Sequence, residues 1–333
     1  MKILYLTRPY ADYQGANYQS DVINFLCKKF EVTVKVLQTS YGTPNGELIT
    51  KNYQNNLIDQ ANCFDLVFLG HNLLGDHPTE NIKPFGLEFL HKVKTDKVAF
   101  VQKEYARLKD KLEFFKKFKI KILISHLGDV SKIKLTDYNP KVIFIPFGFD
   151  PEVFKKNNQL SKKWDLCFSG ILKNPTWPDE EQIYRKETMS KLFVTLNWIK
   201  ILKKTPARIF WNSFMPGEGL KNILNRYKRL GTIDYYEMLS QSKFTLCTTS
   251  CGLITPRFFE SMASGSTPIT FPNQYVNKIT GLNENLCVVN NFSELETKIL
   301  GKQEPNPEQV MEFAHSNHSW EHRINLLASK LEL

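Results

Sequence analysis

Short apolar runs alternate with stretches of helical periodicity along this chain. Runs rich in Val, Ile, Leu and Phe predict buried strands, while apolar residues spaced three and four apart predict helices. Strands are expected at residues 2–7, 32–37, 66–70, 97–102, 121–126 and 142–147, then at 165–170, 208–212, 244–249, 268–271 and 286–290. Helices are expected at 17–29, 48–61, 88–94, 103–119, 182–203, 219–226, 235–242, 256–264, 293–300 and 320–330.

This alternation predicts an α/β fold with two doubly wound, Rossmann-like domains. Strands that alternate with helices form parallel sheets with helices on both faces. The segment 145–151, which contains two prolines and a glycine, precedes the polar stretch 155–163 and separates the two groups of strands. Ligands of such sheets bind beyond the carboxyl ends of the strands, so a cleft between two facing domains is the expected site.

The segment 250–271 carries the clearest local chemistry. It predicts a helix that begins after Thr255, with Pro256 at its first position, and that ends at Gly265. An apolar stripe is formed by Phe258, Phe259, Met262 and Ala263, and a polar stripe by Arg257, Glu260, Ser261 and Ser264. A guanidinium and a carboxylate beside a helix N-terminus suit the phosphates and hydroxyls of a nucleotide sugar. The alternative is an amphipathic surface helix with an ion pair between Arg257 and Glu260.

Composition narrows the classes of partner. Hydrophobic residues make up 42% of the 333 and charged residues 23%, as in a globular protein, and the formal net charge is +10. This excess favours anionic partners such as nucleotides, phospholipid surfaces or nucleic acid. The segment 97–121 is the most basic. Its helix is either a basic amphipathic surface for anionic lipid or an acidic acceptor, or a core-facing helix with a solvated lysine face.

Targeting and redox features favour a cytoplasmic protein. Met1 and Lys2 lead directly into an apolar strand, and no apolar run has the length of a membrane span, so neither a signal peptide nor a transmembrane helix is expected. The 6 cysteines lack CxxC spacing and are expected to be buried free thiols. Peripheral contact with the inner face of an anionic membrane stays open as an alternative.

Several nucleotide-binding and catalytic motifs are absent from the sequence. The chain has no GxGxxG after its first strand and no P-loop, which disfavours dinucleotide dehydrogenases and P-loop NTPases. HExxH, GxSxG and Asp-x-Asp are also absent. We therefore expect no metal and no other cofactor. Backbone amides, a helix N-terminus and arginine would supply the counter-charge for a pyrophosphate.

Four segments resemble motifs of GT-B glycosyltransferases. Residues 147–154, FGFDPEVF, resemble the linker motif PFGxDPxxF, and residues 164–170 resemble the start of the second domain. Residues 235–265 resemble the nucleotide-sugar block of the group 1 type, with the closest similarity to its CgeB-like branch. Residues 319–323, SWEHR, resemble the motif sWxxR before the last helix.

The resemblance implies a domain plan and a donor site. An acceptor domain at 1–150 would face a nucleotide-sugar domain at 151–316, and the last helix, 317–333, would return to the first domain. The donor-binding residues that it implies are Gly15, Gly170, Arg185, Thr255, Arg257 and Glu260. Glu260 is similar to the family's carboxylate that contacts the donor ribose or sugar, and Arg257 to the basic residue beside the phosphates. Gly170 would let the donor approach the backbone closely.

Other implied roles meet departures from the family pattern. Arg185 is similar to an arginine that points at the pyrophosphate, with a surface charge on a long helix as the alternative. Gly15 would face the donor from the first domain, although the chain has Tyr13-Gln-Gly15-Ala where relatives often have a Gly-Gly pair. Some retaining relatives carry a second acid where this chain has Leu253, so inversion or retention stays open.

An inverting transfer needs a base for the acceptor hydroxyl. Candidates that follow strands of the first domain are Asp12, His71, Glu104 and His126. His71 ends a strand that resembles the DxVxxH strand of related transferases, and a structural histidine is the alternative. Of these, Asp12, His71 and Glu104 are the predicted catalytic residues.

These features predict a metal-independent glycosyltransferase of the hexosyltransferase class, EC 2.4. It would move a sugar from a UDP- or GDP-hexose to a hydroxyl of a glycan or another acceptor, in glycan biosynthesis. One alternative is a nucleotide-sugar epimerase of the same fold. Another is a nucleic-acid binder or a base-glycosylating enzyme, which the charge favours but no RNA- or DNA-binding motif supports. The last alternative is a non-catalytic scaffold that keeps the same fold.

Overall fold

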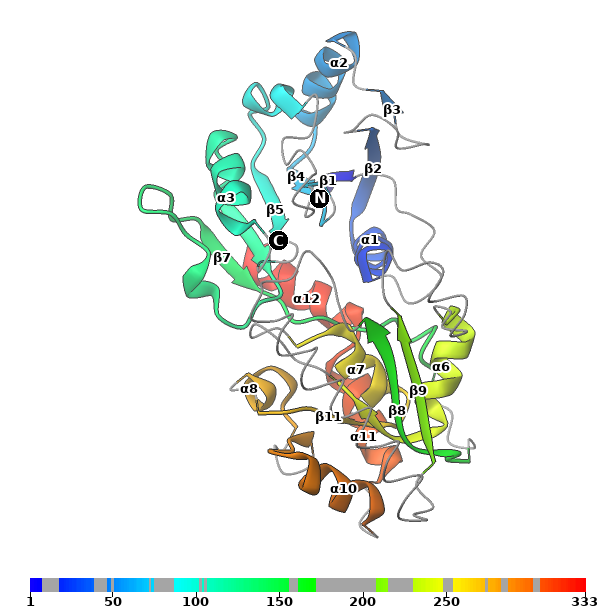
Figure 1. Ribbon diagram of the computed structural model, residues 1–333. Coiled ribbons are helices and arrows are strands. Elements are labelled where there is room, and N and C mark those ends of the chain that lie inside the picture. Colours follow the sequence, from blue (N-terminus) through cyan, green and yellow to red (C-terminus); the bar gives the residue numbers. More distant parts are fainter. Residues whose placement is uncertain are drawn as a thin grey trace. The chain divides into compact units, whose positions relative to one another are not determined.

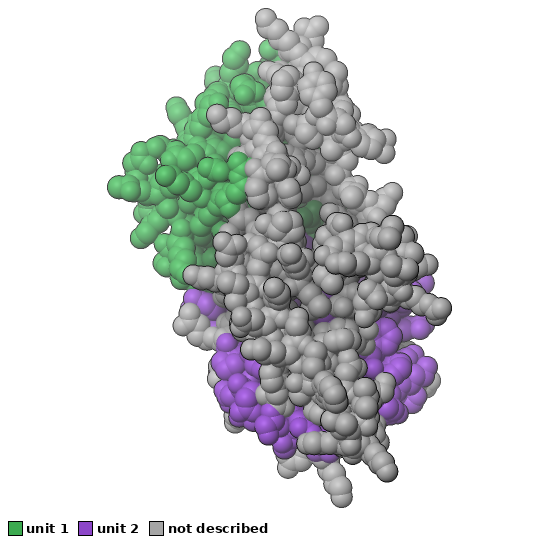
Figure 2. Space-filling view, in the orientation of Figure 1, with its two compact units in different colours: residues 1–13, 19–146, 323–333 green, residues 14–18, 147–322 purple. Residues whose placement is uncertain are grey.

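Two compact units make up the chain in its computed structural model (Figure 1, Figure 2). Unit 1 contains Met1–Tyr13, Gln19–Pro146 and Arg323–Leu333, and unit 2 contains Gln14–Tyr18 and Phe147–His322. The structure describes residues 1–7, 18–38, 47–48, 51–71, 73–74, 87–101, 104, 107–155, 161–171, 208–214, 230–247, 254–272, 275–282, 287–301 and 306–333. The helices expected at 182–203 and 219–226 lie outside these residues.

Unit 1 is built on a 7-stranded parallel sheet with the order β3-β2-β1-β4-β5-β6-β7. Its strands are β1 (Lys2–Thr7), β2 (Glu31–Gln38), β3 (Glu47–Leu48), β4 (Leu66–Leu69), β5 (Lys97–Val101), β6 (Ile122–Ser125) and β7 (Lys141–Phe144). All of β4 is buried, as its continuous apolar sequence predicts for a strand covered on both faces. The strand order reverses between β1 and β4, which is the switch point of a doubly wound sheet. The segments that follow β4, β5, β6 and β7 all leave the sheet at its carboxyl edge, where ligands of such sheets bind.

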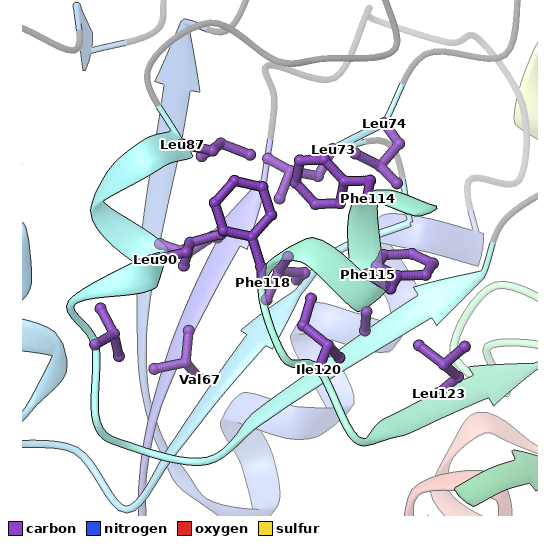
Figure 3. Close-up of a cluster of buried hydrophobic side chains, with 14 of the residues drawn as sticks. Val67, Leu73, Leu74, Leu87, Leu90, Phe114, Phe115, Phe118, Ile120 and Leu123 are labelled. Carbon is purple, nitrogen blue, oxygen red and sulfur yellow. The ribbon is translucent and has the colours of Figure 1, made fainter. Parts of the chain in front are cut away.

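Helices of unit 1 supply its hydrophobic core. They are α1 (Tyr18–Lys29), α2 (Lys51–Ala61), η1 (Leu87–His91), α3 (Leu108–Lys117), η2 (Val130–Lys132) and the part of α12 (Trp320–Leu331) that follows residue 322. In Figure 3, side chains of the α3 and η1 segments meet side chains of the sheet; the labelled residues are Val67, Leu73, Leu74, Leu87, Leu90, Phe114, Phe115, Phe118, Ile120 and Leu123. Phe115 is 1% exposed, and burial of such a side chain contributes about 1.5–3 kcal/mol.

The helix expected at 103–119 is shorter than predicted and faces the core. It begins at Leu108, because Arg107 has φ 54° in the left-handed region that a helix cannot continue from. Leu112 and Phe115 pack into the core cluster, as the core-facing alternative expects. The apolar face of α3 is therefore occupied by the protein itself, which contradicts the lipid-facing alternative.

The last helix packs on unit 1. Lys29 donates to the side-chain oxygen of Asn325, and the Nζ of Lys330 donates to the carbonyl oxygen of Phe144 at 3.2 Å. The Nζ of Lys141 donates to the carbonyl oxygen of Lys330 at 3.3 Å. The chain thus ends against the unit in which it began.

Unit 2 is built on a 4-stranded parallel sheet with the order β11-β10-β8-β9. Its strands are β8 (Trp164–Ile171), β9 (Ile209–Phe214), β10 (Ser242–Leu246) and β11 (Thr267–Ile269), and its described helices are α6 (Thr232–Ser240), α7 (Pro256–Ala263), α8 (Val276–Thr280), α10 (Phe292–Leu300) and α11 (Pro307–Asn317). The strand expected at 286–290 forms only a single bridge between Thr270 and Val288. Both α8 and α11 were not predicted.

Cysteine burial corrects one expectation. Cys167, Cys247 and Cys287 are buried free thiols, but Cys27 and Cys63 are exposed. Cys27 lies on the outward face of α1, and Cys63 lies in the turn after α2, so neither enters a core. Among the described residues, no helix has the length and apolar character needed to cross a membrane.

Candidate functional site

The N-terminus of α7 leaves a buried hydroxyl without a partner. Thr255 occupies the N-cap position and Pro256 follows it, as the sequence predicts. The Thr255 side chain makes no capping hydrogen bond, however, and its Oγ1 is buried with no partner. Buried polar groups are nearly always hydrogen-bonded, so this hydroxyl is a position where an absent ligand or water is expected.

The C-terminus of α7 is fixed as predicted. Gly265 has φ +71°, a conformation that glycine adopts without strain. The N–H of Ser266 donates to the carbonyl oxygen of Ser261 at 2.9 Å, and the N–H of Gly265 donates to that of Met262 at 2.9 Å. This pair of bonds is a Schellman motif, which ends the helix and turns the chain into β11.

Arg257 adds a positive charge to the same helix end. Its guanidinium carbon lies 5.5 Å from the centre of the Phe168 ring, and its Nε is buried without a hydrogen-bond partner. The N-terminus of a helix is itself positive, so a guanidinium there is stable only with compensating groups and attracts anions strongly. Burial opposes the charge of Arg257, but Tyr235, Cys247 and Glu260 favour it and raise its pKa.

Gly170 gives this guanidinium its space. Gly170 lies near the carboxyl end of β8, where ligands of parallel sheets bind. A Cβ built on Gly170 would lie 2.9 Å from the Nη2 and 3.0 Å from the Nη1 of Arg257, and 3.1 Å from the Cζ of Phe168. Any side chain at residue 170 would therefore displace the guanidinium.

Glu260 and Tyr235 form the second half of the site. The Tyr235 hydroxyl, from the first turn of α6, donates to the Oε2 of Glu260 at 2.8 Å. Burial raises the pKa of Glu260 to about 7, against the lowering effects of the Tyr235 hydrogen bond and the Arg257 charge. Burial and the neighbouring Glu260 raise the pKa of Tyr235. Glu260 is 6% exposed, so the alternative that places this residue on a surface helix is wrong.

Unit 1 brings two predicted histidines together. His71 follows β4, His126 follows β6, and their Nε2 atoms lie 2.8 Å apart. The His71 ring stacks on Phe100 of β5 with ring centres 3.9 Å apart, and so spans the strand between the two histidines. The Nδ1 of His126 lies 2.6 Å from the carbonyl oxygen of Ile145, which follows β7. The two rings are 1% and 3% exposed.

Glu104 supports this pair from the segment after β5. Its Oε1 accepts hydrogen bonds from the Oγ of Ser125 at 2.7 Å and from the backbone N–H of His126 at 3.0 Å. The side chain is 4% exposed, and burial raises its pKa. Glu104 therefore holds the end of β6 in place, a structural task that competes with its predicted role as a base.

The structure places six of the nine predicted site residues. Gly170, Thr255, Arg257 and Glu260 lie at the carboxyl end of the unit 2 sheet, and His71 and Glu104 lie at that of the unit 1 sheet. Asp12, Gly15 and Arg185 lie outside the described residues. Tyr235 and Phe168 were missed as site residues. Tyr235 lies in the segment that resembles the nucleotide-sugar block, which was its only sequence signal.

Across the described segments, no group of three or more His, Cys, Asp or Glu side chains has the arrangement of a metal site. Because each unit also includes residues that are not described, the prediction of a metal-independent reaction stays a prediction.

Comparison with known proteins finds a family model that matches part of the chain and solved structures that share its fold. Residues 199–329, which include α6 and α7, match the family model described as glycosyl transferase-like. No curated protein matches the chain. Three solved structures resemble it over nearly the whole chain, and at their low identities this likeness shows the fold.

Sucrose-phosphate synthase from Thermosynechococcus elongatus is 10% identical, covers 100% of this chain and 98% of its own, and has a TM-score of 0.59. The E. coli trehalose-6-phosphate structure bound with UDP-2-fluoro glucose is 10% identical, covers 99% of both chains and has a TM-score of 0.59. AviGT4, a glycosyltransferase of avilamycin A biosynthesis, is 14% identical, covers 99% of this chain and 97% of its own, and has a TM-score of 0.56. The chain thus has the GT-B fold of these structures, and its residues 199–329 are similar to the glycosyl transferase-like family.

Proposed function

We propose that this glycosyltransferase uses a nucleotide-sugar donor bound by unit 2 and a hydroxyl acceptor bound by unit 1. The observation that carries the donor site is the guanidinium of Arg257, held beside Gly170 at the N-terminus of α7. Its surroundings include two buried groups that lack partners, the Nε of Arg257 and the Oγ1 of Thr255. Phosphate oxygens of a donor would satisfy both groups.

The leaving diphosphate gains negative charge as the bond to the anomeric carbon breaks. A fixed guanidinium and the N–H groups of a helix N-terminus stabilise such a charge without reorganisation. Arg257 and α7 would supply this stabilisation without a metal ion. Glu260, hydrogen-bonded to Tyr235, would accept a hydroxyl of the donor ribose or sugar, as the family resemblance implies.

A UDP-hexose is the donor that we favour. One structural neighbour, from E. coli, is bound with UDP-2-fluoro glucose. A GDP-hexose remains the second choice, and the acceptor is a glycan or another cytoplasmic hydroxyl compound.

His71 is the proposed base for the acceptor hydroxyl. Burial, followed by the nearby His126, lowers the pKa of His71 well below its usual range. The imidazole is thus neutral at neutral pH, which is the form that a general base needs. Asp12 stays a second candidate.

A screen of UDP-, GDP-, dTDP-, ADP- and CMP-sugars tests this proposal directly. A ligand that binds only the folded state stabilises it by mass action, and at one hundred times Kd the gain is about 2.7 kcal/mol. We expect one sugar nucleotide, a UDP-hexose first, to raise Tm by several degrees, equally with and without EDTA. Slow hydrolysis or transfer of that donor is then followed by NMR.

Other results of the screen contradict specific parts of the proposal. No shift with any sugar nucleotide would overturn the donor class, and a shift lost in EDTA would overturn metal independence. Isomerised donor formed without an acceptor would indicate the epimerase alternative. Binding with no turnover in the presence of many acceptors would favour the scaffold.

Substitution of Gly170 by alanine is expected to weaken donor binding about tenfold. The new Cβ would meet the guanidinium of Arg257 and push it out of the site. The fold should survive, because the atoms that must move are at the end of a flexible side chain. Isothermal titration gives the Kd, and a thermal scan checks that Tm changes by less than about 3 °C, the effect of roughly 1 kcal/mol.

Gly231 provides the matched control in the same unit. A Cβ on Gly231 would have the Oδ2 of Asp234 as its nearest neighbour at 3.7 Å, an ordinary contact. Gly231→Ala should therefore bind donor like the unaltered chain. Equal affinities of Gly170→Ala and Gly231→Ala would contradict the placement of the phosphates beside Arg257.

A further inference from the structure

Two helices of unit 2 bring a tyrosine hydroxyl to a buried carboxylate. Tyr235 lies in the first turn of α6 and Glu260 in the second turn of α7, and the two helices pack together within the unit (Figure 1). The Tyr235 hydroxyl donates to the Oε2 of Glu260 at 2.8 Å. Glu260 is 6% exposed, whereas Tyr235 is half-buried. A tyrosine from one helix thus fixes a carboxylate that another helix places near the end of the sheet.

The bond leaves the carboxylate able to accept more hydrogen bonds. Burial, followed by the charge of Glu260, raises the pKa of Tyr235, so this hydroxyl keeps its proton at neutral pH and donates it. An ionised carboxylate only accepts, and it offers about four directions for hydrogen bonds. The bond from Tyr235 takes one of these directions at Oε2. The others suit a hydroxyl of a bound nucleotide sugar.

The same bond favours the ionised form of Glu260. Burial disfavours the carboxylate, while the hydrogen bond from Tyr235 and the charge of Arg257 favour it. Cys247, which follows β10, is a further titratable group beside Glu260, and burial raises its pKa to about 12, so its thiol stays neutral. Loss of the Tyr235 hydroxyl would therefore raise the pKa of Glu260 without any change in formal charge.

We propose that Tyr235 is a positioning residue for nucleotide-sugar binding: its hydroxyl holds the Glu260 carboxylate in the orientation that accepts a hydroxyl of the ribose or the sugar. The inference rests on the proposed function and deepens it. Tyr235 acts through Glu260 and does not itself contact the ligand. A residue of α6 thus decides how well a carboxylate of α7 serves the site.

Tyr235→Phe tests this role because it removes the hydroxyl and keeps the ring. We expect Kd for UDP-glucose, or for the nucleotide sugar that the screen identifies, to increase about tenfold, as for one lost hydrogen bond to a charged group. The loss should appear in KM, with kcat within about twofold, because the contact is already made in the bound substrate. Isothermal titration and steady-state kinetics measure the two effects.

Tyr236→Phe is the matched control. The rings of Tyr235 and Tyr236 both pack on Phe154, but the Tyr236 hydroxyl donates to the carbonyl oxygen of Lys155 at 3.0 Å. The control thus loses the same atom from the neighbouring position and should bind the nucleotide sugar like the unaltered chain. Equal affinities of the two variants would overturn the inference.

A double-mutant cycle with Glu260→Ala shows whether Tyr235 acts through the carboxylate. In the Glu260→Ala chain, the further change Tyr235→Phe should alter Kd by less than about twofold. A tenfold loss in both backgrounds would mean that Tyr235 contacts the ligand directly, which contradicts the positioning role. A thermal scan shows whether the Glu260→Ala chains are folded, and the titration that follows does not depend on them.

The ionisation of Glu260 provides a readout that a loss of packing alone would not move. NMR of chains labelled with ¹³C at the glutamate carboxyl carbon follows it from pH 5 to 9 without ligand, with Glu260→Gln to assign the signal. Its midpoint of about 7 should rise by on the order of one pH unit in Tyr235→Phe and stay unchanged in Tyr236→Phe. An unchanged or lower midpoint in Tyr235→Phe overturns the inference.

Nucleotide-sugar binding should follow the same titration. Affinity is expected to fall as the pH falls through the midpoint, because a protonated carboxyl is a weaker acceptor than a carboxylate. In Tyr235→Phe this fall should begin at higher pH than in the unaltered chain. Coincident pH profiles of Kd in these two proteins would contradict a role that passes through Glu260.

Failure of the inference and failure of the proposed function give different results. If the screen finds no nucleotide sugar, the proposed function fails, and the role of Tyr235 falls with it whatever the titration shows. If a nucleotide sugar binds and Tyr235→Phe binds it like Tyr236→Phe, the proposed function stands and only the inference fails.

Discussion

Arg257→Ala is expected to lower kcat/KM for sugar transfer by about two to three orders of magnitude. Removal of one preorganised donor to a developing negative charge has effects of this size in other enzymes. Arg257 occupies such a position, since it adds a guanidinium to the positive end of α7 beside Gly170. Steady-state kinetics with the donor found in the screen measure the loss.

The way in which the loss is divided between kcat and KM shows whether Arg257 contacts the diphosphate mainly in the transition state or already in the bound substrate. Negative charge on the diphosphate grows as the glycosidic bond breaks, so most of the loss should be in kcat. Arg257→Lys keeps a charge but loses the planar pair of N–H groups, and should recover only part of the rate. Circular dichroism and Tm show whether either variant remains folded, because Arg257 also packs on Phe168.

Arg208 is a suitable control for Arg257. It lies just before β9, at the amino end of the same sheet, and its guanidinium is 3.5 Å from the carboxylate of Asp165. Arg208→Ala removes the same charge from unit 2 but from the edge away from the proposed donor, and should keep kcat/KM within about threefold. Similar rates for Arg257→Ala and Arg208→Ala would mean that only net charge matters.

The sheets were predictable from sequence because their strands are buried on both faces. Continuous apolar runs located β1 at its observed bounds and β4 and β5 within one residue. Helix α11 was missed although Asn306 caps it and Pro307 opens it, because its sequence has few apolar residues to mark a stripe. A strand that is buried on both faces has a continuous run of apolar residues, which is easy to recognise in the sequence. A helix that buries only a narrow stripe has no such run.

The two ends of α7 were predicted from the sequence, but the contacts that its side chains make were not. Thr255 and Gly265 occupy the positions that their residue types indicate, since N-caps and left-handed stops depend on local geometry. The buried state of Glu260 depends on Tyr235, which arrives from another helix. No local pattern fixes such a contact.

The histidine pair shows the same limit more strongly. Each histidine follows a predicted strand, so each was a candidate on its own. Their bond requires the His71 ring to cross β5 over Phe100 and reach the end of β6. Strand order decides this, and strand order comes from the packing of the whole unit.

Glu260→Gln is expected to raise the free energy of unfolding of unit 2 relative to the unaltered chain. This gain should be about 3 kcal/mol larger at pH 8 than at pH 4.5. Burial raises the pKa of Glu260 from 4.5 to about 7, so between these values the folded state keeps a proton that the unfolded state releases. Stability therefore falls as the pH rises through this window, by about 1.4 kcal/mol per unit, and stays lower above it. Glutamine cannot ionise, keeps an oxygen for the Tyr235 hydroxyl, and removes this loss.

The comparison isolates this carboxyl from other titrating groups. The buried His71 and His126 have lowered pKa values, and so destabilise the fold in the opposite direction, as the pH falls below about 6.5. That effect is common to both proteins and cancels in their difference. Glu237→Gln, an exposed change on α6, is the control for the removal of a carboxylate from this unit.

Thermal unfolding from pH 4.5 to 8 measures the difference. A change of about 3 kcal/mol corresponds to a shift in Tm on the order of 10 °C for a unit of this size. The variant's advantage should appear between pH 5 and 7 and level off above. Parallel Tm curves for Glu260→Gln and the unaltered chain would mean that Glu260 is ionised throughout, with Arg257 as its counter-charge. The buried carboxyl would then be a fixed anion beside the proposed phosphate site, and a phosphate there would have to overcome its repulsion.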